Sequence, residues 1–326
     1  MKDITFPYDS SDLFRLCESL AKSCSNRLSL SLHNCYPFNE THEYLPLKVA
    51  KLDLGHVWLY HFKHNMSSFD VFAKRMAKRV THLNLKLFDL KTEEAIQVLE
   101  SLSSIESLKQ LVLHFDYEIR SFHELTPSLA SIGKKCRLLH SFELIFKSSK
   151  MTENSFDFLK NFKNLKRLSL HYTNFSNNCY TFNCLKSCGQ LLSLKLTNIT
   201  ISDQFFQNID SIVANLVNFE IIEWPNNRSL TDDNIRCISS LKKLKSLKIE
   251  SDYDQSMAIT ADGINYLVNY SKKLQTIRFV YMLFQSITYQ LMNELKNNSK
   301  VDISFISCES EEPEEYDFDL DDYYQQ

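Results

Sequence analysis

The chain has 326 residues, of which 44% are hydrophobic and 24% are charged, and its formal net charge is −3. Only 4 residues are glycine, and none lies in a GxGxxG or GxxxxGKS/T pattern, which excludes the glycine-rich loops that cradle phosphates. No run approaches the ~20 apolar residues of a membrane-spanning helix, so the sequence predicts no membrane partner.

The cysteine count and the first residues bear on the compartment. Nine cysteines is an odd number, whereas a secreted disulfide framework normally has an even number. The opening stretch MKDITFPYDSSDLF lacks the basic and apolar regions of a signal peptide. We therefore expect reduced thiols and a cytoplasmic location, a nuclear location or both.

A six-residue pattern of the form Leu-x-x-Leu-x-Leu recurs through the chain with spacings of 22 to 31 residues. The last two apolar positions of each copy are two residues apart, so they share one face of a short strand. A period in the twenties with this core is typical of a leucine-rich repeat. In chain order, the copies begin at Arg27, Val49, Val80, Leu108, Leu139, Leu165, Leu191, Leu216, Leu244, Leu274 and Asn298.

Between the copies the sequence predicts helices of about three turns, which cover the apolar face of the strands. Most helix starts pair a hydroxyl residue with an acid in the first turn, as expected of an N-cap. At Thr126 a proline follows, which suits the first helical position. The predicted starts are Thr92, Thr126, Thr152, Ser202 and Thr231.

The cysteines fall at regular places in these units. Cys24, Cys136 and Cys188 each lie three residues before a strand motif, and Cys184 and Cys237 each lie seven before one. Offsets of seven and three are one helical turn apart, so these positions share the buried face of the helix. We expect the cysteines to act as small core residues.

The units resemble the cysteine-containing leucine-rich repeats of F-box/LRR proteins, which run Thr-Asp-x-Gly-Leu…Leu…Cys-x-x-Leu-x-x-Leu-x-Leu. The stretch ITADGINYLVNYSKKLQTIRF matches the opening, and LKSCGQLLSLKL matches the cysteine and the strand. The resemblance covers roughly residues 10–308. It implies an α/β horseshoe of about ten strand–helix units over residues 1–308, with a parallel sheet on the concave side.

The resemblance also implies a function. It predicts a non-enzymatic module that binds a partner protein on its concave face, as the substrate-recognition subunit of a cullin-type ubiquitin ligase that binds a ligase adaptor. The sequence departs from the family in two ways, of which the first predicts irregular turns and the second counts against the ligase. The Asn or Cys expected at the ninth strand position is mostly absent, and no F-box is visible, since YLPLKV at Tyr44 runs straight into a strand. The alternative is a box-free regulatory scaffold or inhibitor of the ribonuclease-inhibitor-like or acidic-tailed kind.

Two clusters have residue types that bind metals. Cys179, Cys184 and Cys188 form C-x4-C-x3-C, a spacing that matches no common ligand frame. His56, His61 and His64 have no carboxylate or cysteine nearby. We expect no metal and no cofactor. We also expect no enzyme and no catalytic residues, because no segment outside the repeats builds a catalytic cleft.

The third, fifth, seventh and eighth residues of each motif are predicted to line the concave face. In the central units the eighth residues are aromatic, and an exposed aromatic row rimmed by basic residues is typical of a protein-binding hot spot. The alternative is that the eighth residue is core. The predicted partner-binding residues are Lys86, His114, Phe115, Phe146, Arg167, His171, Tyr172 and Lys195.

Charge separates the body from the tail. Residues 309–326 contain nine acids and no base, which leaves residues 1–308 at +6. We expect a disordered acidic tail, which either keeps the protein soluble or folds back for part of the time onto the basic body. Nucleic acid is not expected as a partner, because acids such as Glu143, Glu220 and Glu250 are scattered among the bases of the concave face.

Overall fold

The computed structural model describes most of the repeat region. The described residues are 28–31, 49–58, 66–88, 90–115, 122–147, 151–172, 179–222, 230–251, 256–280, 283–284, 289–298 and 300–306. Several expectations lie outside them, namely those for Cys24, His61, His64 and the acidic tail 309–326.

Eleven strands form one sheet in which every strand lies beside its neighbour in the chain order of the repeats. All the pairs are parallel. The predicted horseshoe with a parallel sheet is confirmed. The strands are β1 (Leu28–Ser31), β2 (Val49–Trp58), β3 (His82–Phe88), β4 (Gln110–Phe115), β5 (Ser141–Phe146), β6 (Arg167–Tyr172), β7 (Ser193–Thr197), β8 (Asn218–Ile222), β9 (Ser246–Glu250), β11 (Thr276–Val280) and β13 (Asp302–Ile306).

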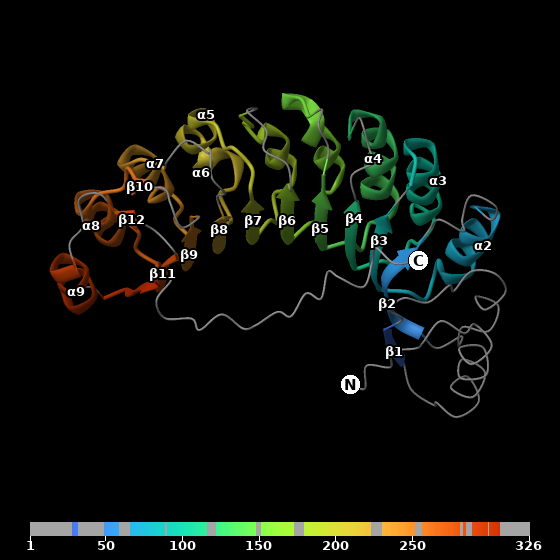
Figure 1. The fold of residues 1–326 in the computed structure, drawn as a ribbon, viewed down its shortest axis with the longest axis horizontal. Helices are drawn as coiled ribbons and strands as arrows, with labels where there is room; N and C mark the ends of the chain where they lie inside the picture. The colour runs from blue at the N-terminus through green and yellow to red at the C-terminus, as the bar shows by residue number, and fades with distance from the viewer. Residues whose placement is uncertain are drawn as a thin grey trace, which may run out of the picture.

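Helices cover the convex side of this sheet, and the strands line the inner side of the arc (Figure 1). The short strands β10 (Ser256–Met257) and β12 (Leu283–Phe284) pair outside the main sheet. The α-helices are α2 (Met66–Met76), α3 (Thr92–Leu102), α4 (Thr126–Lys135), α5 (Asp203–Gln207), α6 (Ile209–Ile212), α7 (Asp232–Ile238), α8 (Ala261–Tyr270) and α9 (Tyr289–Asn298).

Among the described residues, two connections are 3-10 helices where the sequence predicted α-helical turns: η4 (Glu153–Asn161) and η5 (Asn183–Ser187). A further 3-10 turn, η3 (Phe122–Leu125), directly precedes the predicted helix α4. A 3-10 helix rises ~2.0 Å per residue, against 1.5 Å in an α-helix. The nine residues of η4 therefore span roughly 18 Å, more than the roughly 15 Å of the ten-residue α4. A 3-10 helix of nine residues can thus still cover the whole length of a strand.

The predicted N-cap residue is the observed one at three helix starts. At two others the observed N-cap lies one residue earlier than predicted. The hydroxyl of Ser202 accepts from the Phe205 N–H at 3.2 Å, and that of Thr231 accepts from the Asn234 N–H at 3.4 Å. Thr152 directly precedes η4. Thr92 and Thr126, in contrast, are already the first helical residues. Boundary shifts of this size are common, because helix ends fray.

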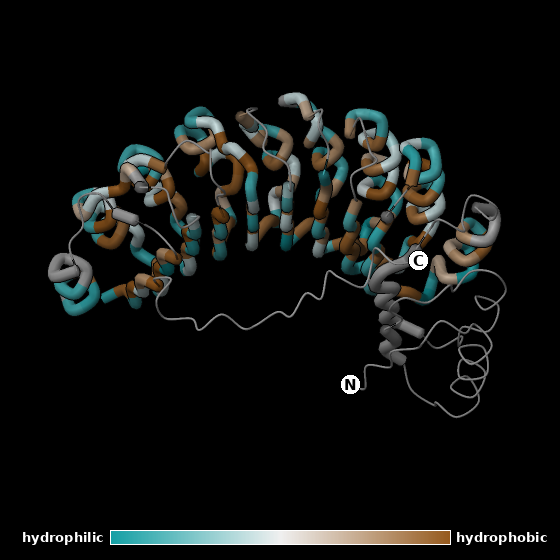
Figure 2. Tube along the Cα trace, in the orientation of Figure 1, coloured by the Kyte–Doolittle hydropathy of each residue, from teal (hydrophilic) through white to brown (hydrophobic). Residues whose placement is uncertain are grey.

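A single hydrophobic core lies between the sheet and the helices, and it contains the fourth and sixth residues of the motifs from Val80 onward. In β4 and β5, half-buried and buried side chains alternate strictly. Hydrophobic and hydrophilic positions also alternate along the strands in Figure 2. Each unit buries its apolar face against its neighbours, as a solenoid requires.

Candidate protein-binding face

The concave face is built from the third, fifth and seventh residues of the repeats, which the parallel register places in three rows across the sheet. In the fifth-position row, Val112 pairs with Glu143 and Ser169 pairs with Lys195 on adjacent strands. Adjacent strands lie ~4.8 Å apart, so each row presents closely spaced side chains. The sequence predicted these three outward positions correctly.

Five of the predicted binding residues lie in these rows. Arg167 is exposed, whereas Lys86, His114, His171 and Lys195 are half-buried. Lys86 pairs in register with His114. Arg167 lies in the third-position row, and its Nε is 3.4 Å from the hydroxyl of Ser141. Lys86, Arg167 and Lys195 make the first half of the described face, from β3 to β7, mainly basic, with one acid, Glu143, on β5.

The three aromatic residues of the predicted row are not on this face. Phe115, Phe146 and Tyr172 are 1%, 1% and 3% exposed, so the expectation of an exposed aromatic row is wrong. The eighth residue shares the parity of the buried fourth and sixth residues, and strand alternation points it into the core. The alternative, that the eighth residue is core, is the one the structure supports.

Phe146 and Tyr172 belong to a cluster of aromatic rings beneath the sheet. The ring centroid of Phe146 lies 4.9 Å from that of Phe122 in η3 and 5.1 Å from that of Tyr172. On the other side Phe156 in η4 lies 5.1 Å from Phe182. Rings at these separations in tilted or edge-on arrangements stabilise one another beyond their burial. The aromatic row therefore holds adjacent repeats together instead of binding a partner.

The second half of the concave face carries charges of both signs. Lys195, Glu220 and Lys248 are register partners on three successive strands, and Arg278 continues the row. Lys248 also pairs with Glu250 on its own strand at 2.6 Å. Lys248 and Arg278 were not among the predicted binding residues, although the fifth position of the motif marks both as outward. This half can bind a partner that carries charges of both signs.

His171 lies between the two halves. It is half-buried, and its register partners are Ile145 on β5 and Thr197 on β7. Burial lowers the pKa of His171, and the positive charge of Lys195 lowers it further, because both disfavour the imidazolium. His171 is therefore neutral at pH 7 and can either donate or accept a hydrogen bond.

The four described cysteines at the predicted helix offsets have the core role predicted for them. Cys136, Cys184 and Cys188 are buried, Cys237 is half-buried, and all four are free thiols. The thiols also reach the preceding unit. The Cys136 Sγ donates to the Ile105 carbonyl at 3.4 Å, and the Cys188 Sγ donates to the Leu159 carbonyl at 3.5 Å. Each of these carbonyls also accepts a backbone N–H, from Leu108 and Phe162 respectively, so the thiols add a second contact that links each helix end to the preceding unit.

The two clusters considered for metals differ in how much of them is described. Cys179 is exposed, whereas Cys184 and Cys188 are buried. Among the described residues, no three His, Cys, Asp or Glu side chains come together as a possible metal site. Within the same residues, no helix is long and apolar enough to cross a membrane.

Comparison with solved structures agrees with the architecture. The chain is similar to the leucine-rich repeat-containing protein LegL7 from Legionella pneumophila, with a TM-score of 0.52 and 14% identity over 90% of this chain and 97% of that chain. It also matches a Bacteroides fragilis protein with a TM-score of 0.48 and 12% identity, over 80% of this chain and 76% of that one. No protein-family model and no curated protein matches the sequence. The fold is that of a leucine-rich-repeat solenoid.

Proposed function

We propose that this protein is a non-enzymatic scaffold that binds a partner protein on its concave face. The observation that carries the proposal is the set of three outward rows, in which charged and histidine side chains surround the apolar Val112, Ile145 and Ile222. Apolar contacts inside a polar rim are the usual composition of a protein interface.

The contact residues we propose are Lys86, His114, Arg167, His171 and Lys195, together with Lys248 and Arg278. A partner with acidic side chains would complement the first half of the face. Complementary charge mainly speeds encounter and selects the partner, whereas the apolar residues contribute more of the affinity.

A finer proposal is that the partner is a substrate of a cullin-type ubiquitin ligase. It is supported by the resemblance of the cysteine-containing repeats to those of F-box/LRR proteins, and it needs a ligase adaptor as a second partner. The alternative is a regulatory scaffold or inhibitor that works without a ligase. The two proposals share the concave face and differ in the second partner.

A capture experiment tests both levels. The tagged full chain is expressed in its own cells, and bound proteins are identified by mass spectrometry. The concave variant Arg167→Glu/Lys195→Glu should lose the partner. Lys91→Glu, an exposed substitution at the start of α3 on the convex side, is the control that should retain it.

The outcomes test binding on the concave face and the choice between ligase and scaffold separately. Cullin and adaptor peptides in the capture support the ligase, and their absence beside another specific partner supports the scaffold. A partner that the concave variant retains as well as the wild type does would refute binding on the concave face.

A further inference from the structure

The two edges of the sheet differ in charge. Each strand is followed by a connection that runs back to start the next parallel strand, so helix starts gather at the carboxyl edge and helix ends at the amino edge. Acids occupy the helix starts: Glu93, Glu94, Asp203, Asp232, Asp233 and Asp262. This placement complements the positive ends of the helix dipoles.

The amino edge is basic. Six exposed residues in the helix ends and turns before β4, β5 and β6 define what we call the basic edge: Lys109, Lys134, Lys135, Arg137, Lys163 and Lys166. Within the part of the chain that the structure describes, none of the six forms an ion pair with a carboxylate. Their positive charge is therefore not neutralised locally.

Backbone hydrogen bonds hold this edge in a fixed arrangement. The N–H of Lys109 donates to the Thr81 carbonyl at 2.7 Å, and the N–H of His140 donates to the Lys109 carbonyl at 3.0 Å. The N–H of Lys166 in turn donates to the His140 carbonyl at 2.8 Å. The backbone that carries these basic side chains is thus hydrogen-bonded from one unit to the next along the edge.

The local field and shape fit anions. Burial lowers the pKa of His140, and the charges of Arg167, Lys166 and Lys109 lower it further. Two hollows lie between the turns. One hollow, of about 540 Å³, is lined by Lys134, Arg137 and Lys163. The other, of about 690 Å³, is lined by Lys78, Lys134, Lys135 and Arg137 and by one acid, Glu106.

Exposed apolar side chains lie among these bases and further along the same amino edge. Leu138 is 54% exposed in the turn before β5, and Leu192 is 40% exposed in the turn before β7. Tyr270, 61% exposed, ends α8 beside Lys272 and Lys273. Of the four large hydrophobic side chains that are exposed in the described residues, three therefore lie on the amino edge, and Val71 is the fourth.

We propose that the basic edge docks on an anionic phospholipid surface. Its lysines and arginine would contact lipid phosphates, while Leu138 and Leu192 would enter the headgroup region, a combination that favours binding at membrane interfaces. A nucleic acid offers phosphates too, but single-stranded binding relies on exposed aromatic rings for stacking, and this edge presents mostly aliphatic side chains. The concave face stays open, so a membrane-bound solenoid could still bind its protein partner.

Vesicle sedimentation tests the proposal with the full chain. The probes are vesicles of phosphatidylcholine alone and vesicles with about one phosphatidylserine in three lipids. The wild type should sediment with the anionic vesicles only, and less at high salt, because the Debye length falls from ~10 Å at 0.1 M to ~3 Å at 1 M.

Matched variants separate position from net charge. Lys134→Glu/Arg137→Glu should weaken vesicle binding by more than about tenfold, given roughly fivefold per basic residue. Lys91→Glu/Lys147→Glu makes the same change in net charge at the opposite, carboxyl edge and should bind nearly as the wild type does. Leu138→Ser should weaken binding with no change in charge.

Three results would overturn the proposal. The first is an absence of sedimentation with anionic vesicles. The second is an equal loss of vesicle binding in the two charge-reversal variants. The third is binding to a single-stranded RNA that is tighter than binding to the vesicles and that Leu138→Ser does not weaken. The last result would make the edge a nucleic-acid surface. None of them affects the capture of a protein by the concave face.

Discussion

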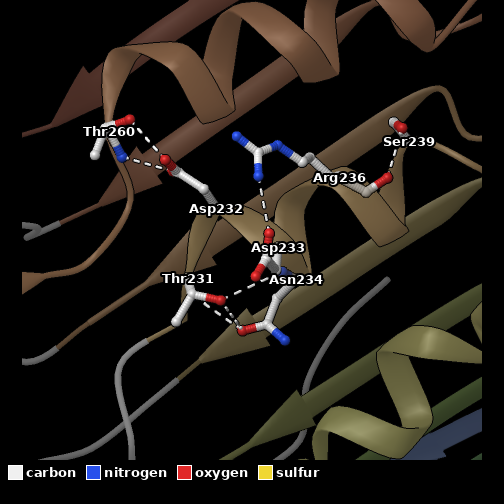
Figure 3. A network of polar contacts seen from close by, with 7 residues as sticks. All are labelled: Thr231, Asp232, Asp233, Asn234, Arg236, Ser239 and Thr260. Atoms are coloured by element: carbon white, nitrogen blue, oxygen red, sulfur yellow. Dashed lines mark hydrogen bonds and ion pairs between the residues drawn. The ribbon is translucent and has the colours of Figure 1, made fainter.

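Asp232 accepts two hydrogen bonds from Thr260, the residue that caps the helix of the next repeat (Figure 3). Its Oδ1 lies 2.8 Å from the Thr260 backbone nitrogen, and its Oδ2 lies 2.7 Å from the Thr260 hydroxyl oxygen. The hydroxyl of Thr260 also accepts from the Asp262 N–H at 3.2 Å. One carboxylate thus links the starts of α7 and α8, and a solenoid depends on such links between neighbours.

We expect Asp232→Ala to lower the free energy of unfolding by about 2 kcal/mol, because it removes two charge-assisted hydrogen bonds to a half-buried partner. Urea denaturation measures the change. The control is Asp233→Ala, whose side chain is 86% exposed in its pair with Arg236 and should cost less than about 1 kcal/mol. Equal losses in the two variants would show that the link to Thr260 contributes nothing.

Gly263→Ala should destabilise the protein although alanine is the better helix former by ~1 kcal/mol. A Cβ at this position would lie 2.7 Å from the Asp232 Cγ, so the carboxylate would have to leave Thr260. In the Asp232→Ala background the same substitution should become neutral or stabilising, a coupling that a double-mutant cycle measures. Gly189→Ala is the control, because its Cβ would meet nothing within 4 Å.

Phe146→Ala should lower the free energy of unfolding by about 3–5 kcal/mol, because it leaves a cavity in the aromatic cluster between η3, η4 and β6. The affinity of the folded variant for the concave-face partner should stay at the wild-type value. Calorimetry and a binding titration below the melting temperature check the two halves. Ile145→Ala is the matched control for stability. Ile145 is the neighbour of Phe146 in the chain, but its half-buried side chain points outward, so its loss should cost less stability. Loss of affinity without loss of stability would restore the aromatic row as a binding site.

The buried thiols should react slowly in the folded protein. Burial raises the pKa of the Cys136, Cys184 and Cys188 thiols to about 12, so at pH 8 only about one in ten thousand is the reactive thiolate. The exposed Cys179 should label first and serves as the internal control. Mass spectrometry after native and denatured labelling gives the rates. Rapid native labelling of Cys136 would mean that its repeat opens easily.

Stability should fall as the pH drops below about 6.5, the ordinary pKa of histidine. Burial lowers the pKa values of His171 and His140 in the folded state, so in this range the unfolded chain binds more protons than the folded one. Stability therefore rises with pH up to the unfolded pKa and is lost on acidification. His171→Asn should flatten the dependence between pH 5.5 and about 7, and His140→Asn/His171→Asn should flatten it further. Urea titrations at each pH check this, and an unchanged slope would contradict it.

The sequence by itself determined the repeating unit, since its signals are local. The apolar positions of each motif predicted the strands, and the hydroxyl and acid of Thr231 and Asp232 predicted a helix start to within one residue. The offsets of Cys136 and Cys188 placed them in the core. Two-residue and 3.6-residue periods depend only on neighbours along the chain, so they can be read without the fold.

Only the tertiary structure decided how units meet. Strand alternation already turns the side chain of Phe146 inward, but which rings pack around it, from η3 and η4, depends on the fold. The partner of Asp232 is set by which unit lies beside it, 28 residues further along the chain. Lys109, Arg137 and Lys166 are far apart in sequence, and they form one basic edge only because parallel strands bring every turn to the same side of the sheet.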